Sequence, residues 1–161
     1  MPNPLPAISS SEQTRRQLRV ERLAKQMEFV GRVEYQHKLT DSGGAQYRQG
    51  SAAKQDQLVV FAEAFDRDSD PNDFSLAAMI AHERGHQLLF RNVVLERMAA
   101  ASNLVSEEIL ASLIGSLIVE SEFDQLCLYG KAILDAQAGG MELVSADRLL
   151  RELRHMLEEV L

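Results

Sequence analysis

The chain has 161 residues, 45% hydrophobic and 25% charged, a composition typical of a single soluble globular domain. Its formal net charge of −7 disfavours general binding to nucleic acid or to anionic membranes. The single cysteine, Cys127, excludes an intrachain disulfide, and the longest apolar run, 109–119, is too short to span a bilayer. The first residues lack a signal-peptide pattern, so we expect a cytoplasmic protein with neither membrane nor nucleic-acid partners.

The first half of the chain is predicted to contain one helix and a small sheet. Residues 1–10 are rich in proline and serine and are expected to form a disordered tail, followed by a helix over about 11–30. Alternating apolar and polar residues over 33–40 predict a half-buried strand, and the DSGG turn predicts a returning strand in AQYRQ. The run QLVVFAEAF (57–65) predicts a central strand. We therefore expect an antiparallel sheet of about three strands.

The second half is predicted to be helical. A polar loop precedes a helix over about 73–90, whose polar centre is flanked by the apolar runs FSLAAMIA and QLLF. A linker or short helix is expected over 92–101, and further helices near 104–120, 121–137 and 145–161. The whole chain is thus predicted to be α+β, with a single domain over 11–161, a core over about 30–120 and C-terminal helices over 121–161.

The stretch HERGH, residues 82–86, carries the clearest chemical signal. Residues four apart on a helix lie on the same face, so His82 and His86 can offer imidazole nitrogens to one metal ion. Glu83 is adjacent to His82 and can take a proton from a metal-bound water, as in the HExxH arrangement of zinc peptidases. The apolar flanks of this helix favour a metal site over two solvated histidines on an ordinary amphipathic helix.

A catalytic zinc site needs a third protein ligand and an open position for water. No cysteine or histidine follows closely after His86, so a carboxylate is the natural choice, and Glu107 and Glu108 on the next long helix are the candidates. Glu108 shares a face of small residues with Ser112 and Gly115, whereas Glu107 lies on a more apolar face. Helix phase alone leaves both carboxylates open.

An apolar strand, a polar loop, the HExxH helix and a later helix with Glu108, Ala111 and Ser112 resemble the gluzincin metallopeptidases. The closest likeness is to the ImmA/IrrE-like group and the minigluzincin core. In that family the third zinc ligand is the first Glu of an ExxA(D/N) pattern, which here selects Glu108 over Glu107. Ser112 stands where the family carries Asp or Asn, the residue that supports a zinc histidine. The resemblance covers roughly residues 30–120 and implies a zincin-like fold.

The resemblance also implies a zinc-dependent metallopeptidase with one Zn²⁺ per chain, bound by His82, His86 and Glu108. The ion would acidify a water and polarise the scissile carbonyl, and Glu83 would act as the general base. A peptide or protein substrate would lie extended along an edge strand of the sheet. The reaction needs a further group that stabilises the oxyanion. The candidates for that group are Tyr129, Tyr35 and His37.

Two other functions fit parts of the sequence. Glu83 with His86 and Glu152 with His155 form two ExxH pairs, as in di-iron carboxylate bundles, although Glu152 and His155 lie opposite the apolar stripe of the last helix. The non-enzyme alternative is a degenerate peptidase whose zinc is structural or which binds a partner. Arg84 motivates this alternative, because zincins usually carry an uncharged residue there. The stripe of the last helix would serve the core or a homodimer through that helix.

Overall fold

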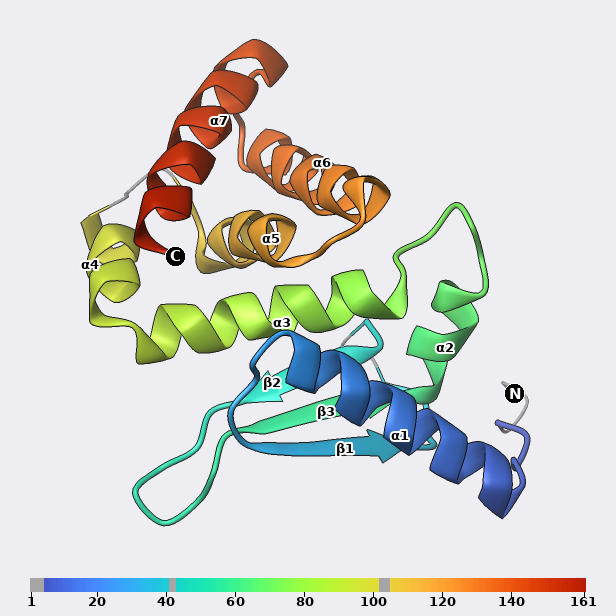
Figure 1. Ribbon diagram of the computed structural model, residues 1–161. Helices are drawn as coiled ribbons and strands as arrows, with labels where there is room; N and C mark the ends of the chain where they lie inside the picture. The colour runs from blue at the N-terminus through green and yellow to red at the C-terminus, as the bar shows by residue number, and fades with distance from the viewer. Residues whose placement is uncertain (1–4, 41–42, 102–104) are drawn as a thin grey trace. The chain divides into compact units, whose positions relative to one another are not determined.

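The computed structural model describes residues 5–40, 43–101 and 105–161. These residues form seven helices and a three-stranded sheet, so the chain is α+β and mostly helical (Figure 1). They fall into two compact units, an N-terminal unit up to residue 80 and a C-terminal unit from residue 81. Within the described ranges, none of the helices combines the length and the apolar character needed to cross a membrane.

The sheet of the N-terminal unit is built around β3 (Gln57–Phe61), whose last four residues are all buried. β1 (Arg32–Gln36) pairs parallel to β3, with Val33 opposite Leu58. β2 (Ala45–Arg48) pairs antiparallel to β3 on its other side, which gives the strand order β1-β3-β2. The prediction that this apolar run forms the central strand is thus confirmed.

The prediction of an antiparallel sheet was wrong, because this sheet is mixed. The strand over 45–48 does follow a chain reversal, but it pairs with β3 and not with β1. The chain reverses again after β2, so β3 runs parallel to β1 and lies between the first two strands. A turn signal in the sequence indicates that the chain reverses, but it does not indicate which strand becomes the neighbour. Residues 41–42 of the predicted DSGG turn lie outside the described residues.

The first helix, α1 (Ser10–Gln26), is shorter at its end than the predicted span of about 11–30. Ser9 caps its start by accepting a hydrogen bond from the N–H of Glu12. Beyond its end, Glu28 has a φ of 59° and Gly31 a φ of 142°, which no helix can accommodate. A Cβ on Gly31 would lie 2.2 Å from the carbonyl oxygen of Asp56, so only glycine fits there. Residues 1–4 of the predicted tail lie outside the described residues.

The N-terminal unit has its own core. Two short segments complete the unit, namely α2 (Ala62–Asp68) and the first turn of α3 (Leu76–Arg91). The predicted central strand over 57–65 is therefore too long, because its last residues belong to α2. The fully buried core residues of this unit include Val20, Leu58, Val60, Ala64, Leu76 and Ile80. The helix α1 and the sheet therefore bury one shared apolar layer, as an α+β architecture requires.

The C-terminal unit is helical, as predicted. It contains the rest of α3, then α4 (Val93–Ala101), α5 (Glu107–Ile118), α6 (Glu122–Ala138) and α7 (Leu143–Val160). Residue 104, the predicted start of the helix that contains α5, lies outside the described residues. The fully buried residues of this core include Leu95, Leu113, Ile114, Ala132, Leu150 and Leu157. Because Leu150 and Leu157 belong to the apolar stripe of α7, that stripe packs in the core of the unit.

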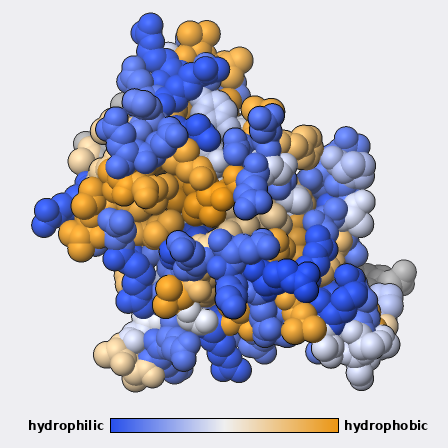
Figure 2. Space-filling model, in the orientation of Figure 1, coloured by the Kyte–Doolittle hydropathy of each residue, from blue (hydrophilic) through white to orange (hydrophobic). Residues whose placement is uncertain are grey.

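Some apolar side chains of the C-terminal unit remain on the surface. Figure 2 shows them gathered over α4 and the C-terminal end of α7, two helices that contact one another. Val93, Val94 and Leu161 are each more than half exposed. A homodimer through the C-terminal helix stays a prediction.

Candidate metal centre

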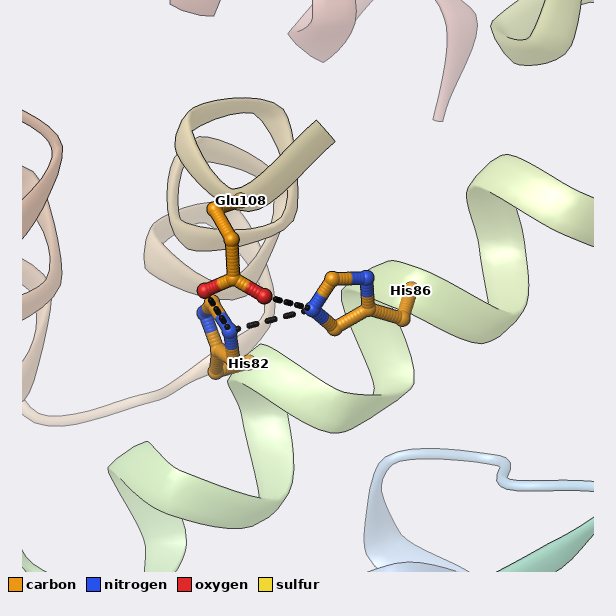
Figure 3. Close-up of side chains that lie close together, drawn as sticks. All are labelled: His82, His86 and Glu108. Carbon is orange, nitrogen blue, oxygen red and sulfur yellow. Dashed lines mark hydrogen bonds and ion pairs between the residues drawn. The ribbon is translucent and has the colours of Figure 1, made fainter. Parts of the chain in front are cut away.

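Two helices of the C-terminal unit bring three ligand-type side chains together. His82 and His86 lie one turn apart on α3, and Glu108 lies in the first turn of α5 (Figure 3). One ligand atom of each residue lies within 4.8 Å of the other two. In the described part of the chain, no other group of three or more histidine, cysteine or carboxylate side chains is close enough to hold a metal ion. These are the three residues that the sequence and the resemblance select as ligands.

The two histidine rings face the carboxylate with their Nε2 atoms. Nε2 of His82 lies 3.1 Å from Oε2 of Glu108, and Nε2 of His86 lies 2.8 Å from Oε1. The two Nε2 atoms are 3.2 Å apart. The His82 side chain is 11% exposed, whereas the Glu108 side chain is 56% exposed, so the cluster is closed on the side of α3 and open beside Glu108.

Small residues let α3 and α5 approach closely enough to form this cluster. A Cβ on Gly85 would lie 2.4 Å from the carbonyl oxygen of Ala111, and a Cβ on Gly115 would lie 3.1 Å from that of Ala81. A glycine inside a helix costs about 1 kcal/mol relative to alanine, and close helix packing offsets that cost here. Ser106 fixes the start of α5 by accepting a hydrogen bond from the N–H of Ile109.

The second ring nitrogen of each histidine, Nδ1, faces away from the cluster and also has a partner. Nδ1 of His82 lies 3.0 Å from the hydroxyl of Ser112, which is fully buried. Nδ1 of His86 lies 3.0 Å from Oε1 of Glu107. Metal-binding histidines usually pair their second nitrogen in this way, which fixes the orientation of the ring. The two carboxylates thus have different contacts in the structure. Glu108 contacts the Nε2 atoms of both histidines, which face the cluster, whereas Glu107 contacts Nδ1 of His86, which faces away from it.

The charges within the cluster are strongly coupled. Burial of the His86 ring opposes protonation, but hydrogen bonds to Glu108 and Glu107 outweigh it and raise the pKa of His86 to about 9. The negative charge of Glu83 acts on His86 in the same direction. Hydrogen bonds from His82 and His86 lower the pKa of Glu108 far below its usual range, against the effect of burial. In the metal-free chain a proton therefore supplies the positive charge that a metal ion would supply.

The donor set fits a divalent metal ion. Two imidazole nitrogens and one carboxylate are the protein ligands of many catalytic zinc sites. In a tetrahedral site with bonds of about 2.0–2.2 Å, neighbouring donor atoms lie about 3.3–3.6 Å apart. Here the two Nε2 atoms are 3.2 Å apart, and they lie 3.1 and 2.8 Å from the two different oxygens of Glu108. With one ligand atom taken from each residue, all three atoms lie within 4.8 Å of one another, close enough to bind a single ion. Other first-row divalent ions accept the same donors.

The central residue of HERGH, Arg84, has a hydrogen-bond partner on its own helix. Its guanidinium donates to Oε1 of Gln87 at 2.7 Å, and Gln87 is 1% exposed. This hydrogen bond holds one N–H of the arginine along α3, towards a buried amide. Arg84, the residue that motivates the non-enzyme alternative, thus takes part in a hydrogen bond within α3.

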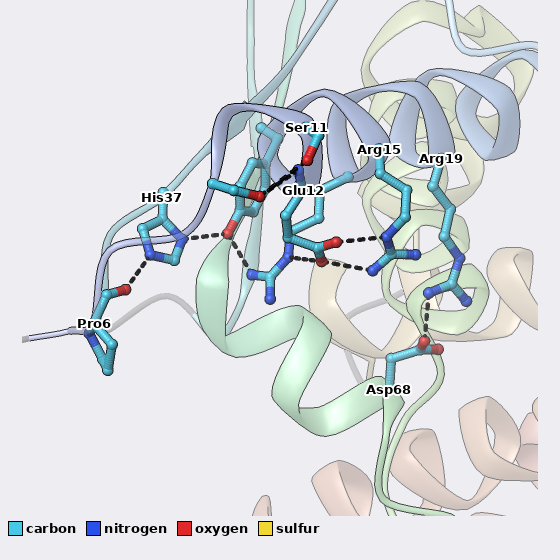
Figure 4. Close-up of polar contacts among 10 residues, drawn as sticks. Pro6, Ser11, Glu12, Arg15, Arg19, His37 and Asp68 are labelled. Carbon is cyan, nitrogen blue, oxygen red and sulfur yellow. Dashed lines mark hydrogen bonds and ion pairs between the residues drawn. The ribbon is translucent and has the colours of Figure 1, made fainter.

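The three oxyanion candidates have other partners. The hydroxyl of Tyr129 donates to Asp147 at 2.7 Å, and burial together with this carboxylate raises the pKa of Tyr129 to about 12. Tyr35 and His37 belong to the N-terminal unit, where the Tyr35 hydroxyl lies 2.7 Å from Nδ1 of His37 (Figure 4). Arg16 donates to the same hydroxyl at 2.7 Å. All three candidates are therefore engaged in hydrogen bonds with other groups.

The second ExxH pair also lies elsewhere. Glu152 and His155 are exposed on α7, and His155 has a weak contact of 3.7 Å with Glu159. A di-iron bundle would need both pairs to converge on one centre. Neither Glu152 nor His155 belongs to the cluster of His82, His86 and Glu108.

Lys131 is a charged neighbour of the cluster that sequence reasoning missed. It lies on α6, and its Nζ is 3.5 Å from Oε2 of Glu108 and 2.9 Å from Oδ2 of Asp135. In the sequence, Lys131 and Asp135 form an ordinary i,i+4 ion pair of a solvated helix face. Only the packing of α6 on α5 brings the lysine to the ligand carboxylate.

Comparisons of the chain with protein-family models, with curated proteins and with solved structures found no match. A function can therefore be proposed only from the side chains of the cluster and their surroundings.

Proposed function

We propose that the chain is a zinc-dependent metallopeptidase of the gluzincin type, which hydrolyses peptide bonds with a water molecule. The observation that carries the proposal is the convergence of His82, His86 and Glu108 with a glutamate, Glu83, directly beside the first histidine. The order of elements along the chain, three strands followed by α3 and then α5, supports a zincin-like fold. Cytoplasmic localisation and a substrate that lies along a sheet edge stay predictions.

Each residue of the site has a distinct role in this proposal. His82, His86 and Glu108 would hold zinc, which when bound lowers the pKa of a water molecule and polarises a carbonyl. Glu83 accepts a proton from the attacking water and returns it to the leaving amine. The hydroxyl of Ser112 holds the His82 ring by its outer nitrogen and keeps Nε2 directed at the cluster.

Metal analysis of the purified full-length chain tests the first part of the proposal. We expect about one zinc ion per chain in the wild type. His82→Ala and Glu108→Ala should lose the metal, because each removes one of three ligands. His155→Ala is the matched control, since His155 is exposed on α7 and should not affect metal content. Two iron ions per chain, or zinc retained in both ligand variants, would contradict the proposal.

A metal-binding domain without activity is the second candidate, and the observation in its favour is Arg84 within the motif. In that function the metal stabilises the fold or a binding surface, and Glu83 has no chemical task. Such a domain would retain zinc, and wild type and Glu83→Gln would be equally inactive towards every peptide tested.

A further inference from the structure

Lys131 places a positive charge beside the ligand cluster. Its ammonium forms an ion pair with Asp135, one turn further along α6, at 2.9 Å. The same nitrogen lies 3.5 Å from Oε2 of Glu108, a distance too long for a strong hydrogen bond. The Lys131 side chain is 31% exposed, so the ammonium is held in place and still reaches solvent.

Neither stability nor metal binding accounts for this position. An ion pair of this kind between helix residues four apart contributes little to stability. A positive charge next to a ligand carboxylate repels a metal cation and reduces the field that attracts it. We therefore expect Lys131 to weaken metal binding slightly.

An anionic oxygen, in contrast, would be stabilised by this ammonium. Lys131 has three N–H donors, and the two carboxylates that contact it within the described residues occupy at most two of them. A preorganised donor aimed at developing negative charge is often the largest single contribution to catalysis of acyl transfer. Tyr129 is less suited to that task, because its hydroxyl already donates to Asp147.

We propose that Lys131 stabilises the oxyanion of peptide hydrolysis, an inference that rests on the proposed function. The oxygen of water forms a bond to the carbonyl carbon while Glu83 takes one of its protons. The π electron pair moves onto the carbonyl oxygen, which accepts a hydrogen bond from Nζ of Lys131 without taking its proton. When the C–N bond breaks, Glu83 gives its proton to the amine nitrogen. Asp135 is a positioning residue that holds the ammonium through its ion pair of 2.9 Å.

The test compares the zinc-loaded full-length wild type with Lys131→Met and Lys131→Arg. The matched control is Lys25→Met, which removes an exposed helical lysine of the N-terminal unit. Two probes separate anion binding from metal binding. A peptide phosphonate mimics the tetrahedral oxyanion, and imidazole is a neutral ligand for zinc. Zinc affinity is measured for each variant, together with kcat and KM on a peptide substrate.

We expect Lys131→Met to bind the phosphonate at least tenfold more weakly and to lose about 100-fold in kcat, the usual effect of removing one oxyanion donor. Lys131→Arg should restore most of both losses, because it retains the positive charge. Zinc and imidazole affinity should be unchanged or slightly higher in Lys131→Met. Phosphonate binding equal to wild type in Lys131→Met, or loss of zinc from this variant, would overturn the inference.

The result also separates this inference from the proposed function. If the wild type hydrolyses peptides and Lys131→Met does so equally well, the role of Lys131 is wrong and the peptidase proposal stands. If the wild type hydrolyses nothing but binds the phosphonate through Lys131, the anion site stands and the peptidase proposal is wrong. A wild type that neither hydrolyses peptides nor binds the phosphonate contradicts both.

Discussion

Glu107 approaches His86 from the side opposite the cluster, with Oε1 at 3.0 Å from Nδ1. Adjacent residues in the first turn of α5 thus contact the same imidazole ring through different nitrogens, because Glu108 contacts Nε2. A carboxylate on the outer nitrogen of a metal-binding histidine fixes the ring and makes it a stronger ligand. Glu107 and Glu108, which helix phase alone leaves equivalent, thus contact different nitrogens of the cluster.

The first prediction concerns these two glutamates. Glu107→Ala should weaken zinc binding by about 10–100-fold, the usual effect of losing an outer partner of a ligand, while Glu108→Ala should abolish it. Competition titration with a chelator of known zinc affinity measures both. If Glu107→Ala releases the metal and Glu108→Ala retains it, the ligand is Glu107 and the assignment is reversed.

The second prediction concerns pH. Because the pKa of His86 is raised to about 9 in the metal-free fold, its proton stabilises that fold fully below the usual value of 6.5. That contribution is lost as the pH rises through about 9. Zinc must displace the same proton, so zinc affinity should rise from pH 6.5 to 9 and binding should release a proton at pH 7.

Calorimetry in two buffers with different ionisation enthalpies measures the protons released on zinc binding. A pH-independent affinity over that range, with no proton release, would show that His86 is already neutral in the metal-free protein. Glu107→Gln is an informative companion variant, because loss of one carboxylate should lower the pKa of His86 and shift the rise in affinity to lower pH.

The third prediction concerns the close contact of α3 and α5. In Gly85→Ala the new methyl group would lie 2.4 Å from the carbonyl oxygen of Ala111 and would force the helices apart. Such overpacking costs about 1–3 kcal/mol. It outweighs the gain of about 1 kcal/mol in helix propensity. Urea denaturation should show a lower free energy of unfolding, and zinc affinity should fall with it.

Gly130→Ala is the matched control for this prediction. Gly130 lies inside α6, and a Cβ there would meet no atom within 4 Å. The free energy of unfolding should therefore rise by about 0.5–1 kcal/mol, with no change in zinc affinity. Equal stabilisation by both substitutions would mean that α3 and α5 are not in close contact at Gly85.

Local patterns in the sequence predicted much of the fold and the core of the site. The helices follow from apolar residues at helical spacing, and the pairing of His82 with His86 follows from that spacing alone. The central strand follows from the unbroken apolar run at Gln57–Phe61. Each of these features depends on residues that are neighbours along the chain.

Features that depend on packing between distant segments could not be predicted in this way. The parallel pairing of β1 with β3 depends on the path of the intervening chain, which no single segment encodes. Glu107 and Glu108 differ by only about 100° around the helix, so the position of α3 decides which of them reaches the inner nitrogens. Lys131 lies 23 residues after Glu108, and it reaches the cluster only because α6 packs on α5.

Hydrolysis of peptides by zinc-loaded wild type and Glu83→Gln, measured side by side, tests the central claim most directly. Glutamine has nearly the same shape as glutamate but cannot accept the proton of water, so the variant should retain one zinc ion per chain. Its kcat should fall about 100-fold or more, as expected for loss of a general base. Equal rates for the two proteins, with equal zinc content, would contradict the proposal that this cluster is the active site of a metallopeptidase.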